Sequence, residues 1–450
     1  MSLDPDAVGR RERAARVVET VAGLLADPAR VAAITDAPDN AMELPEGPWT
    51  PWNAVALSDG YPAVSLLFAE LGAADPARRG TAHEYLAAAL ASPAPVPQPR
   101  LFVGAGSLAF AAHAAAVGFG GYRTLLEKLD ESLVAWIRAR ARADRDRVLA
   151  GRPIGHWDGF DVISGAAGLG RYLLGRHEHA GGAAGEALCE VLTTLVAVAL
   201  ADEVEVEGVR VPAWWVEHGV TAERVDRGGH LNFGLAHGVC GPLALLACAW
   251  RAGVRVDRQD EAMGRIVALL DRWRHADDAG PTWPMAVNLP ALRDLDHRFE
   301  RYREVWCYGA AGIARALYLA GTALGERRWQ DEAHAALAGV HALAGGAVRD
   351  HTLCHGWAGL LQIFLRMAHD TASDDTAPHD YGAAADMFAG RILDGFDPDE
   401  PFGFRYVHRT SMGKNRPGFL EGAAGIALAL HCYATGRPPV TGWDTALLLN

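Results

Sequence analysis

GAAGIARALYLA, at residues 309–320, joins two glycines three residues apart to an apolar run of helical length. A Gly, a small residue three positions later and an apolar run occur together seven times in the chain. The copies begin at Gly60, Gly104, Gly165, Gly238, Gly309, Gly356 and Gly422, and the last five keep both glycines. Small residues one helical turn apart let the start of a helix pack closely against its neighbours. The pattern therefore predicts seven related helices.

Amphipathic segments that carry charge lie between these apolar runs, and four of them are clear, at residues 14–25, 122–141, 260–274 and 329–343. A helix that is apolar on all sides is buried, whereas an amphipathic helix lies at a surface. The alternation predicts an all-α fold, a seven-fold α/α toroid with an inner ring of helices inside an outer ring. Although the length alone would allow about three domains, we expect residues 1–450 to form one toroid domain.

One segment departs from the helical pattern. Residues 204–212 alternate apolar and polar side chains around Gly208, and residues 213–216 extend the segment with two tryptophans. This alternation is typical of a short β-hairpin. We therefore expect a small β-rich extension over residues 202–231, inserted between the third and fourth repeats.

Composition limits the classes of partner and the compartment. The 450 residues carry a net charge of −13, which argues against binding to nucleic acid or to an anionic membrane. Six cysteines in so long a chain do not make a disulfide framework, so reduced thiols or a metal site in the cytosol are expected. Residues 101–122 lack charge and could span a bilayer, but they are rich in Ala and Gly. A buried helix of a soluble protein explains them better.

Three residues that could bind a metal lie one or two positions before repeat glycines. Cys307 precedes the fifth repeat, and Cys354 and His355 precede the sixth. In a ring of repeats these junctions would converge at one end, where two thiolates and an imidazole suit Zn²⁺ and leave a fourth position open. Buried cysteine is also common and inert, so both interpretations stay open on chemistry alone. The other cysteines fall in apolar runs and are assigned to the core: Cys189, Cys240, Cys248 and Cys432.

Three further side chains share this position relative to the repeats. His237 directly precedes Gly238, Asp161 lies four residues before Gly165, and Arg303 lies four residues before Cys307. Each has a structural alternative: a satisfied core histidine, a helix N-cap or a surface charge. Their common place beside the candidate metal ligands favours a functional role.

The motifs WCYG at residues 306–309, CHG at 354–356 and GLAHG at 234–238 resemble those of the LanC lanthipeptide cyclases, the nisin cyclase family. Their order along the chain is similar too, and the seven repeats extend the resemblance over about residues 57–435. The resemblance implies a seven-fold α/α toroid that binds one zinc ion per chain. It implies that Cys307, Cys354 and His355 are the ligands.

The same resemblance implies that His237, Asp161 and Arg303 are catalytic, and it adds Tyr308 from the WCYG motif. Tyr rather than His at this position is closer to the bacterial cyclases than to the animal LanC-like proteins. Ala311 stands where the family often has Pro, and the first two repeats are degenerate, with Ala63 and Ser107 in the second position. The resemblance does not decide which of His237 and Asp161 is the acid and which the base.

The activity implied is the addition of a cysteine thiol to a dehydroalanine or dehydrobutyrine of the same dehydrated precursor peptide. A dehydratase and a membrane transporter are the partners implied, with the chain itself cytoplasmic or associated with the membrane through the transporter. One alternative is a LanC-like protein that binds zinc and glutathione without forming rings. A second is an α/α-barrel glycosidase using Asp161 and Glu421, and a third is a zinc-containing prenyltransferase subunit.

Overall fold

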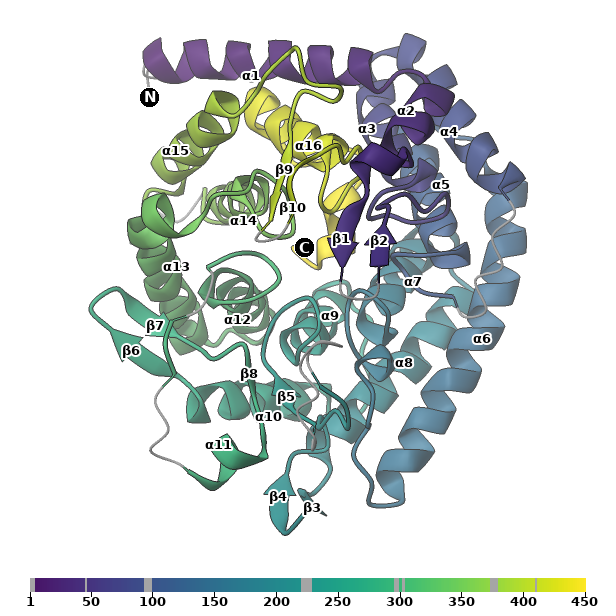
Figure 1. Cartoon of the computed structure of the whole chain (residues 1–450). Helices are drawn as coiled ribbons and strands as arrows, with labels where there is room; N and C mark the ends of the chain where they lie inside the picture. Colours follow the sequence, from purple (N-terminus) through teal and green to yellow (C-terminus); the bar gives the residue numbers. More distant parts are fainter. Residues whose placement is uncertain are drawn as a thin grey trace. The chain divides into compact units, whose positions relative to one another are not determined.

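The computed structural model describes residues 5–44, 47–92, 99–219, 229–294, 299–301, 304–372, 379–408 and 411–450. These residues form sixteen α-helices, with only short strands between them, which confirms the expected all-α class (Figure 1). The contacts between residues divide the chain into two compact units. Unit 1 comprises residues 1–129 and 348–444, and unit 2 comprises residues 130–347 and 445–450.

Unit 1 contains four of the seven predicted buried helices. They pack one against the next in the order α14 (Trp357–Asp370), α16 (Ala423–Thr435), α3 (Tyr61–Ala74) and α5 (Ala105–Phe119). Each of the first three has an outer partner: α15 (Tyr381–Asp394) on α14, α1 (Pro5–Leu24) on α16 and α4 (Arg79–Ala91) on α3. The N-terminal helix α1 thus completes the hairpin that the last repeat begins (Figure 1).

Unit 2 contains the other three buried helices, which pack in the order α7 (Ala166–Ala180), α9 (Cys240–Arg251) and α12 (Ala310–Leu324). Their outer partners are α8 (Ala183–Leu200) on α7, α10 (Gln259–Arg272) on α8 and α9, and α13 (Arg327–Ala347) on α12. The long helix α6 (Arg123–Leu149) carries the chain from one unit into the other. All seven predicted inner helices are therefore present, each beginning one or two residues after its repeat glycine.

The remaining elements are short. Two-stranded antiparallel pairs join β1 (Met42–Leu44) to β2 (Gly47–Trp49), β3 (Val204–Val206) to β4 (Val209–Val211), β5 (Leu231–Asn232) to β8 (Ala286–Val287), β6 (His275–Asp277) to β7 (Gly280–Thr282), and β9 (Tyr406–His408) to β10 (Ser411–Lys414). Short helices complete the description: α2 (Pro28–Thr35), α11 (Leu289–Arg293), η1 (Pro38–Asn40), η2 (Pro76–Arg78), η3 (Trp157–Gly159) and η4 (Trp443–Leu447). The β3–β4 pair is the hairpin expected around Gly208; of the wider segment 202–231, residues 220–228 lie outside the described residues.

Most of the uncharged segment 101–122 forms helix α5, whose residues 106–115 are buried, as expected for a core helix. A different helix, α8, is the one in the described part of the chain that has the length and apolar composition of a membrane span. More than half of it is buried, and it packs on α7 and α10. Core helices of soluble proteins have the same properties, so α8 is weak evidence for a membrane span.

A repeated loop holds the start of the inner helices. The N–H groups of residues 357–359 donate to the carbonyls of residues 350–352 at 3.0–3.3 Å, and those of residues 423–425 donate to residues 416–418 at 2.9–3.1 Å. The first N–H groups of these helices, which have no partner within the helix, are thus satisfied by backbone seven residues earlier. The chain must pass so close that a Cβ on Gly425 would lie 1.8 Å from the Phe419 carbonyl oxygen. This close passage explains the repeat glycines.

Candidate active site and metal centre

In unit 2, Asp161 and His237 form a hydrogen-bonded pair. Asp161 Oδ2 lies 2.6 Å from His237 Nδ1, and the other carboxylate oxygen accepts the Ser164 N–H at 2.7 Å. The Asp161 side chain is 0% exposed, whereas that of His237 is 28% exposed. Burial raises the pKa of Asp161, and the hydrogen bond with His237 opposes part of that rise. The pair therefore presents the imidazole, and not the carboxylate, to a reacting molecule.

Aromatic rings surround His237. The Trp157 ring centroid lies 5.2 Å from that of His237, and the Tyr308 centroid lies 6.5 Å away. Asn232 donates its side-chain N–H to the Tyr308 hydroxyl at 3.3 Å. Trp157 and Asn232 did not stand out in the sequence, because neither belongs to a motif with a chemical function. Trp157 lies 80 residues before His237 in the chain, so only the fold brings these two rings together, whereas Asn232 lies five residues before His237.

Cys307 lies in the same unit as His237, and two loops hold it there. Its carbonyl accepts the Ala236 N–H at 3.4 Å, which joins the WCYG loop to the GLAHG loop. The loops meet so closely that a Cβ on Gly234 would lie 2.4 Å from the Cys307 carbonyl oxygen. The structure thus brings together the sequence-predicted residues Asp161, His237, Cys307 and Tyr308 within unit 2.

Arg303 lies outside the described residues. The nearby described arginine, Arg301, forms ion pairs with Asp277 at 2.6 Å and with Glu304 at 2.7 Å. Glu304 in turn accepts the Ala310 N–H at 2.6 Å, at the first residue of α12. Burial raises the pKa of Glu304, and its bond to Arg301 opposes that rise. Glu304 is thus a structural cap that fixes the helix following the WCYG motif.

Unit 1 carries the other two predicted metal ligands at the start of α14. The Cys354 N–H donates to the Leu420 carbonyl at 2.9 Å, which ties the CHG loop to the loop before α16. His355 Nε2 lies 3.2 Å from Glu421 Oε1. Glu421 occupies in the seventh repeat the position that His355 occupies in the sixth, directly before the repeat glycine.

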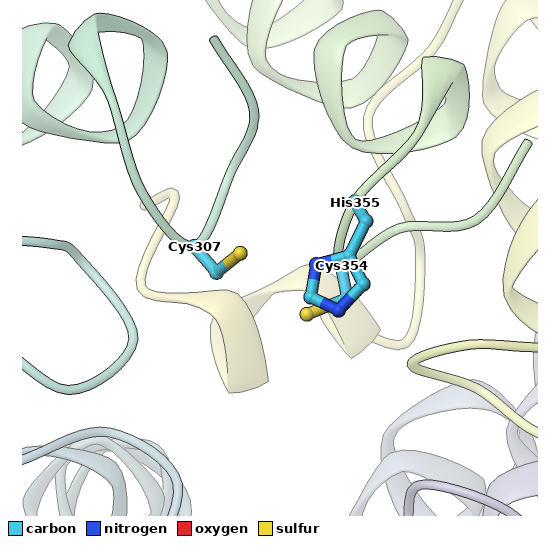
Figure 2. A group of neighbouring side chains, drawn as sticks. All are labelled: Cys307, Cys354 and His355. Atoms are coloured by element: carbon cyan, nitrogen blue, oxygen red, sulfur yellow. The ribbon is translucent and has the colours of Figure 1, made fainter. Parts of the chain in front are cut away.

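Cys307, Cys354 and His355 form a group whose composition suits a metal ion (Figure 2). Each offers one ligand atom, and the three atoms lie within 4.8 Å of one another. No other set of three or more His, Cys, Asp or Glu residues in the described ranges has this arrangement. Two sulfurs and one imidazole nitrogen are ligands that Zn²⁺ prefers, and three protein ligands leave a tetrahedral ion one open position.

The other cysteines behave as core residues. None of the six, all of which are described, takes part in a disulfide. Cys240, Cys248 and Cys432 are buried, and Cys189 is half-buried. Burial raises the pKa of the Cys240 and Cys432 thiols, so they stay protonated and unreactive.

Comparisons with known proteins agree with these motifs. A family model described as "Lanthionine synthetase C-like protein" matches residues 51–448. The curated relative "Nisin biosynthesis protein NisC" of Lactococcus lactis subsp. lactis is 25% identical over 226 residues, which cover 49% of this chain and 49% of the relative. The chain's match thus spans about half the length of that relative.

The solved structure of "Nisin cyclase" superposes with a TM-score of 0.68 at 21% identity, covering 88% of this chain and 92% of that one. This match confirms the predicted LanC-type α/α toroid fold. At 21% identity, the superposition shows similarity of the fold only.

Proposed function

Since this chain belongs to the lanthionine synthetase C-like family, we propose that it is a zinc-dependent lanthipeptide cyclase. The substrate is a precursor peptide in which serine and threonine have been dehydrated. The sulfur of a peptide cysteine bonds to the β-carbon of a dehydroalanine or dehydrobutyrine in the same peptide, and a proton goes to the α-carbon. The product is a lanthionine or methyllanthionine ring.

The group formed by Cys307, Cys354 and His355 carries this proposal. A zinc ion bound there would lower the pKa of the substrate thiol, which otherwise lies near 8.5, and keep it as a thiolate. Two cysteinate ligands make the site formally neutral, so a substrate sulfur stays electron-rich. Neither a core role for these cysteines nor a glycosidase explains this donor set.

We assign the proton transfers to His237 and its orientation to Asp161. A carboxylate that accepts from Nδ1 leaves Nε2 of a neutral imidazole free to exchange a proton with the substrate. The 0% exposure of Asp161 and its two bonds, to His237 and Ser164, support a positioning role for it. Tyr308, whose ring lies beside that of His237, is proposed to contact the reacting peptide. Arg303 is proposed to balance negative charge that develops as the sulfur adds.

We also propose that the chain works with three partners: the precursor peptide, a dehydratase and a transporter. The β3–β4 hairpin is proposed to belong to a small extension, over residues 202–231, that contacts the peptide. A dehydratase must prepare the substrate, and a transporter that exports the product is its expected neighbour at the membrane. The chain is proposed to act in the cytoplasm. The net charge of −13 supports a partner other than nucleic acid.

The test is incubation of the purified zinc-loaded protein with a dehydrated precursor peptide, followed by alkylation and mass counting of free thiols. Cyclisation leaves the peptide mass unchanged and removes one alkylatable thiol for each ring. A protein that binds zinc and glutathione without forming rings leaves the thiol count as it was, and that result would overturn the proposal.

Replacement of the catalytic histidine sharpens this test. His237→Ala should slow thiol loss by about 10²–10⁴-fold while the circular dichroism spectrum is unchanged. His369→Ala is the matched control, because His369 is exposed at the end of α14 and takes no part in the site. An unchanged rate in His237→Ala would remove His237 from the mechanism.

A further inference from the structure

Glu421 has two partners of different kinds, one on each carboxylate oxygen. Oε1 lies 3.2 Å from His355 Nε2, and Oε2 lies 2.5 Å from Arg416 Nη1. The Glu421 side chain is only 18% exposed. Sequence reasoning considered this residue only as a carboxylate of a possible glycosidase. A carboxylate held between an arginine and an imidazole is poorly placed for that chemistry, but well placed to orient the imidazole.

Arg416 holds Glu421 firmly, because its own surroundings fix it. The Arg416 side chain is 4% exposed, and its Nε donates to Asp59 Oδ2 at 2.7 Å. Asp59 is fully buried and also accepts the Gly418 N–H at 3.0 Å. The guanidinium lies over the Tyr406 ring, 4.6 Å from its centroid. Arg416 lies between two carboxylates, and its planar and rigid guanidinium fixes the position of the Glu421 side chain.

The position of the Glu421 carboxylate decides which nitrogen of the His355 ring carries the proton. A carboxylate oxygen facing Nε2 favours the tautomer that carries its proton on Nε2, and Nδ1 is then the nitrogen that carries the lone pair in the plane of the ring. Histidines that bind metals generally direct their other nitrogen to such a carboxylate, which fixes the ring and makes the ligand more basic.

We propose that Glu421, anchored by Arg416 and Asp59, is the carboxylate that orients His355 for zinc, so that the metal is bound through Nδ1. This inference rests on the proposed zinc site. Glu421 is a positioning residue: it would touch neither the substrate nor the ion. Its removal should leave three ligands in place and weaken their hold on the metal, typically by about 10–100-fold.

The measurement is metal affinity, independent of any peptide. Metal-free protein is titrated with Zn²⁺ in competition with a chromophoric chelator, and with Co²⁺ while the thiolate charge-transfer absorption is followed. We expect Glu421→Ala to bind zinc about 10–100-fold more weakly than the wild type, with the same charge-transfer intensity for each Co²⁺ bound. Glu421→Gln keeps an oxygen that can accept from Nε2, so it should recover part of the affinity.

Two controls separate orientation from general damage. Glu400→Ala removes another carboxylate paired with an arginine, Arg405, and should leave zinc affinity unchanged. The melting temperature of each metal-free variant shows whether the fold survives; if Glu421→Ala fails to fold, the comparison of Glu421→Gln with the wild type decides. Wild-type affinity in a folded Glu421 variant would overturn this inference and leave the zinc site standing. A wild type that binds no zinc would instead overturn the proposed function.

Discussion

At the scale of single residues, the two groups of the Asp161–His237 pair differ in exposure, and we propose a different task for each. The carboxylate is fully buried and bonded on both oxygens, and the imidazole is partly exposed. Sequence reasoning left open which of the two exchanges protons with the substrate. The difference in exposure supports the imidazole, because a general acid or base must come within hydrogen-bond distance of the reacting group.

Replacement of Asp161 by an isosteric neutral residue should separate stability from activity. Because burial raises the pKa of Asp161, the folded protein holds this proton more tightly than the unfolded chain does. The charge therefore costs stability as the pH rises through that raised value, and it costs none well below the ordinary pKa. Asp161→Asn cannot ionise, so its unfolding free energy should increase relative to the wild type between about pH 4 and about pH 7.

Urea unfolding followed by circular dichroism at both pH values measures this difference. In the same variant, thiol loss from a dehydrated peptide should slow by about 10²–10⁴-fold, because an amide can donate to Nδ1 and favour the wrong tautomer. A stability difference that does not change with pH would show that Asp161 titrates normally in the folded protein.

The site residues differ in how far the sequence could predict them. Each of these residues lies within two positions of a repeat glycine, so their common position could be read from the chain: Cys307, Cys354, His355 and His237. The role of Glu421 could not, because its anchor Arg416 is fixed by Asp59, which is 357 residues away. An ion pair across that separation leaves no local pattern.

At the scale of elements, the inner helices depend on the loops that precede them. The repeat glycines predicted where these helices begin, because only a residue without a side chain tolerates the returning backbone. The reason for the spacing could not be predicted: the N–H groups of the first turn reach carbonyls seven residues earlier, and this requires the folded loop. The same loops hold the proposed metal ligands and His237.

Gly425→Ala tests this dependence. The added Cβ would lie 1.8 Å from the Phe419 carbonyl oxygen, so the loop must move, and we expect the unfolding free energy to fall by about 2–4 kcal/mol. Gly264→Ala is the control: this glycine lies inside α10 with open space around it, and the change should stabilise the protein by about 0.5–1 kcal/mol. Thermal or urea unfolding measures both. A loss of less than about 0.5 kcal/mol in Gly425→Ala would contradict the role given to the loop.

At the scale of the whole molecule, composition predicted a soluble globular protein, and the repeat pattern predicted helices and the number of repeats. Length alone would allow about three domains, whereas one family model and one superposed structure each cover most of the chain. The partner of α1 could not be predicted: an amphipathic pattern shows that a helix covers something, but not which distant helix it covers.

Removal of the metal should lower the stability of the protein. A ligand that binds only the folded state stabilises it by about 2.7 kcal/mol at a hundredfold excess over its Kd. We therefore expect one zinc ion per chain by elemental analysis, and a melting temperature that falls by several degrees when a chelator removes it.

Two cysteine variants test this prediction, one at a proposed ligand and one away from the site. Cys354→Ala should lose both the bound zinc and the effect of the chelator on melting. Cys189→Ala, which removes a half-buried thiol of α8, should keep both. Full zinc content in Cys354→Ala would contradict the assigned ligands.

The pairing of α1 with α16 also sets the order of events during synthesis. Helix α1 is made long before its partner α16, so the apolar face of α1 that packs on α16 stays uncovered until α16 has left the ribosome. Contacts between such distant segments form slowly, and the exposed surface is prone to aggregation in the meantime. The pairing of α1 with α16 therefore predicts a need for chaperones during translation and sensitivity to termination before α16.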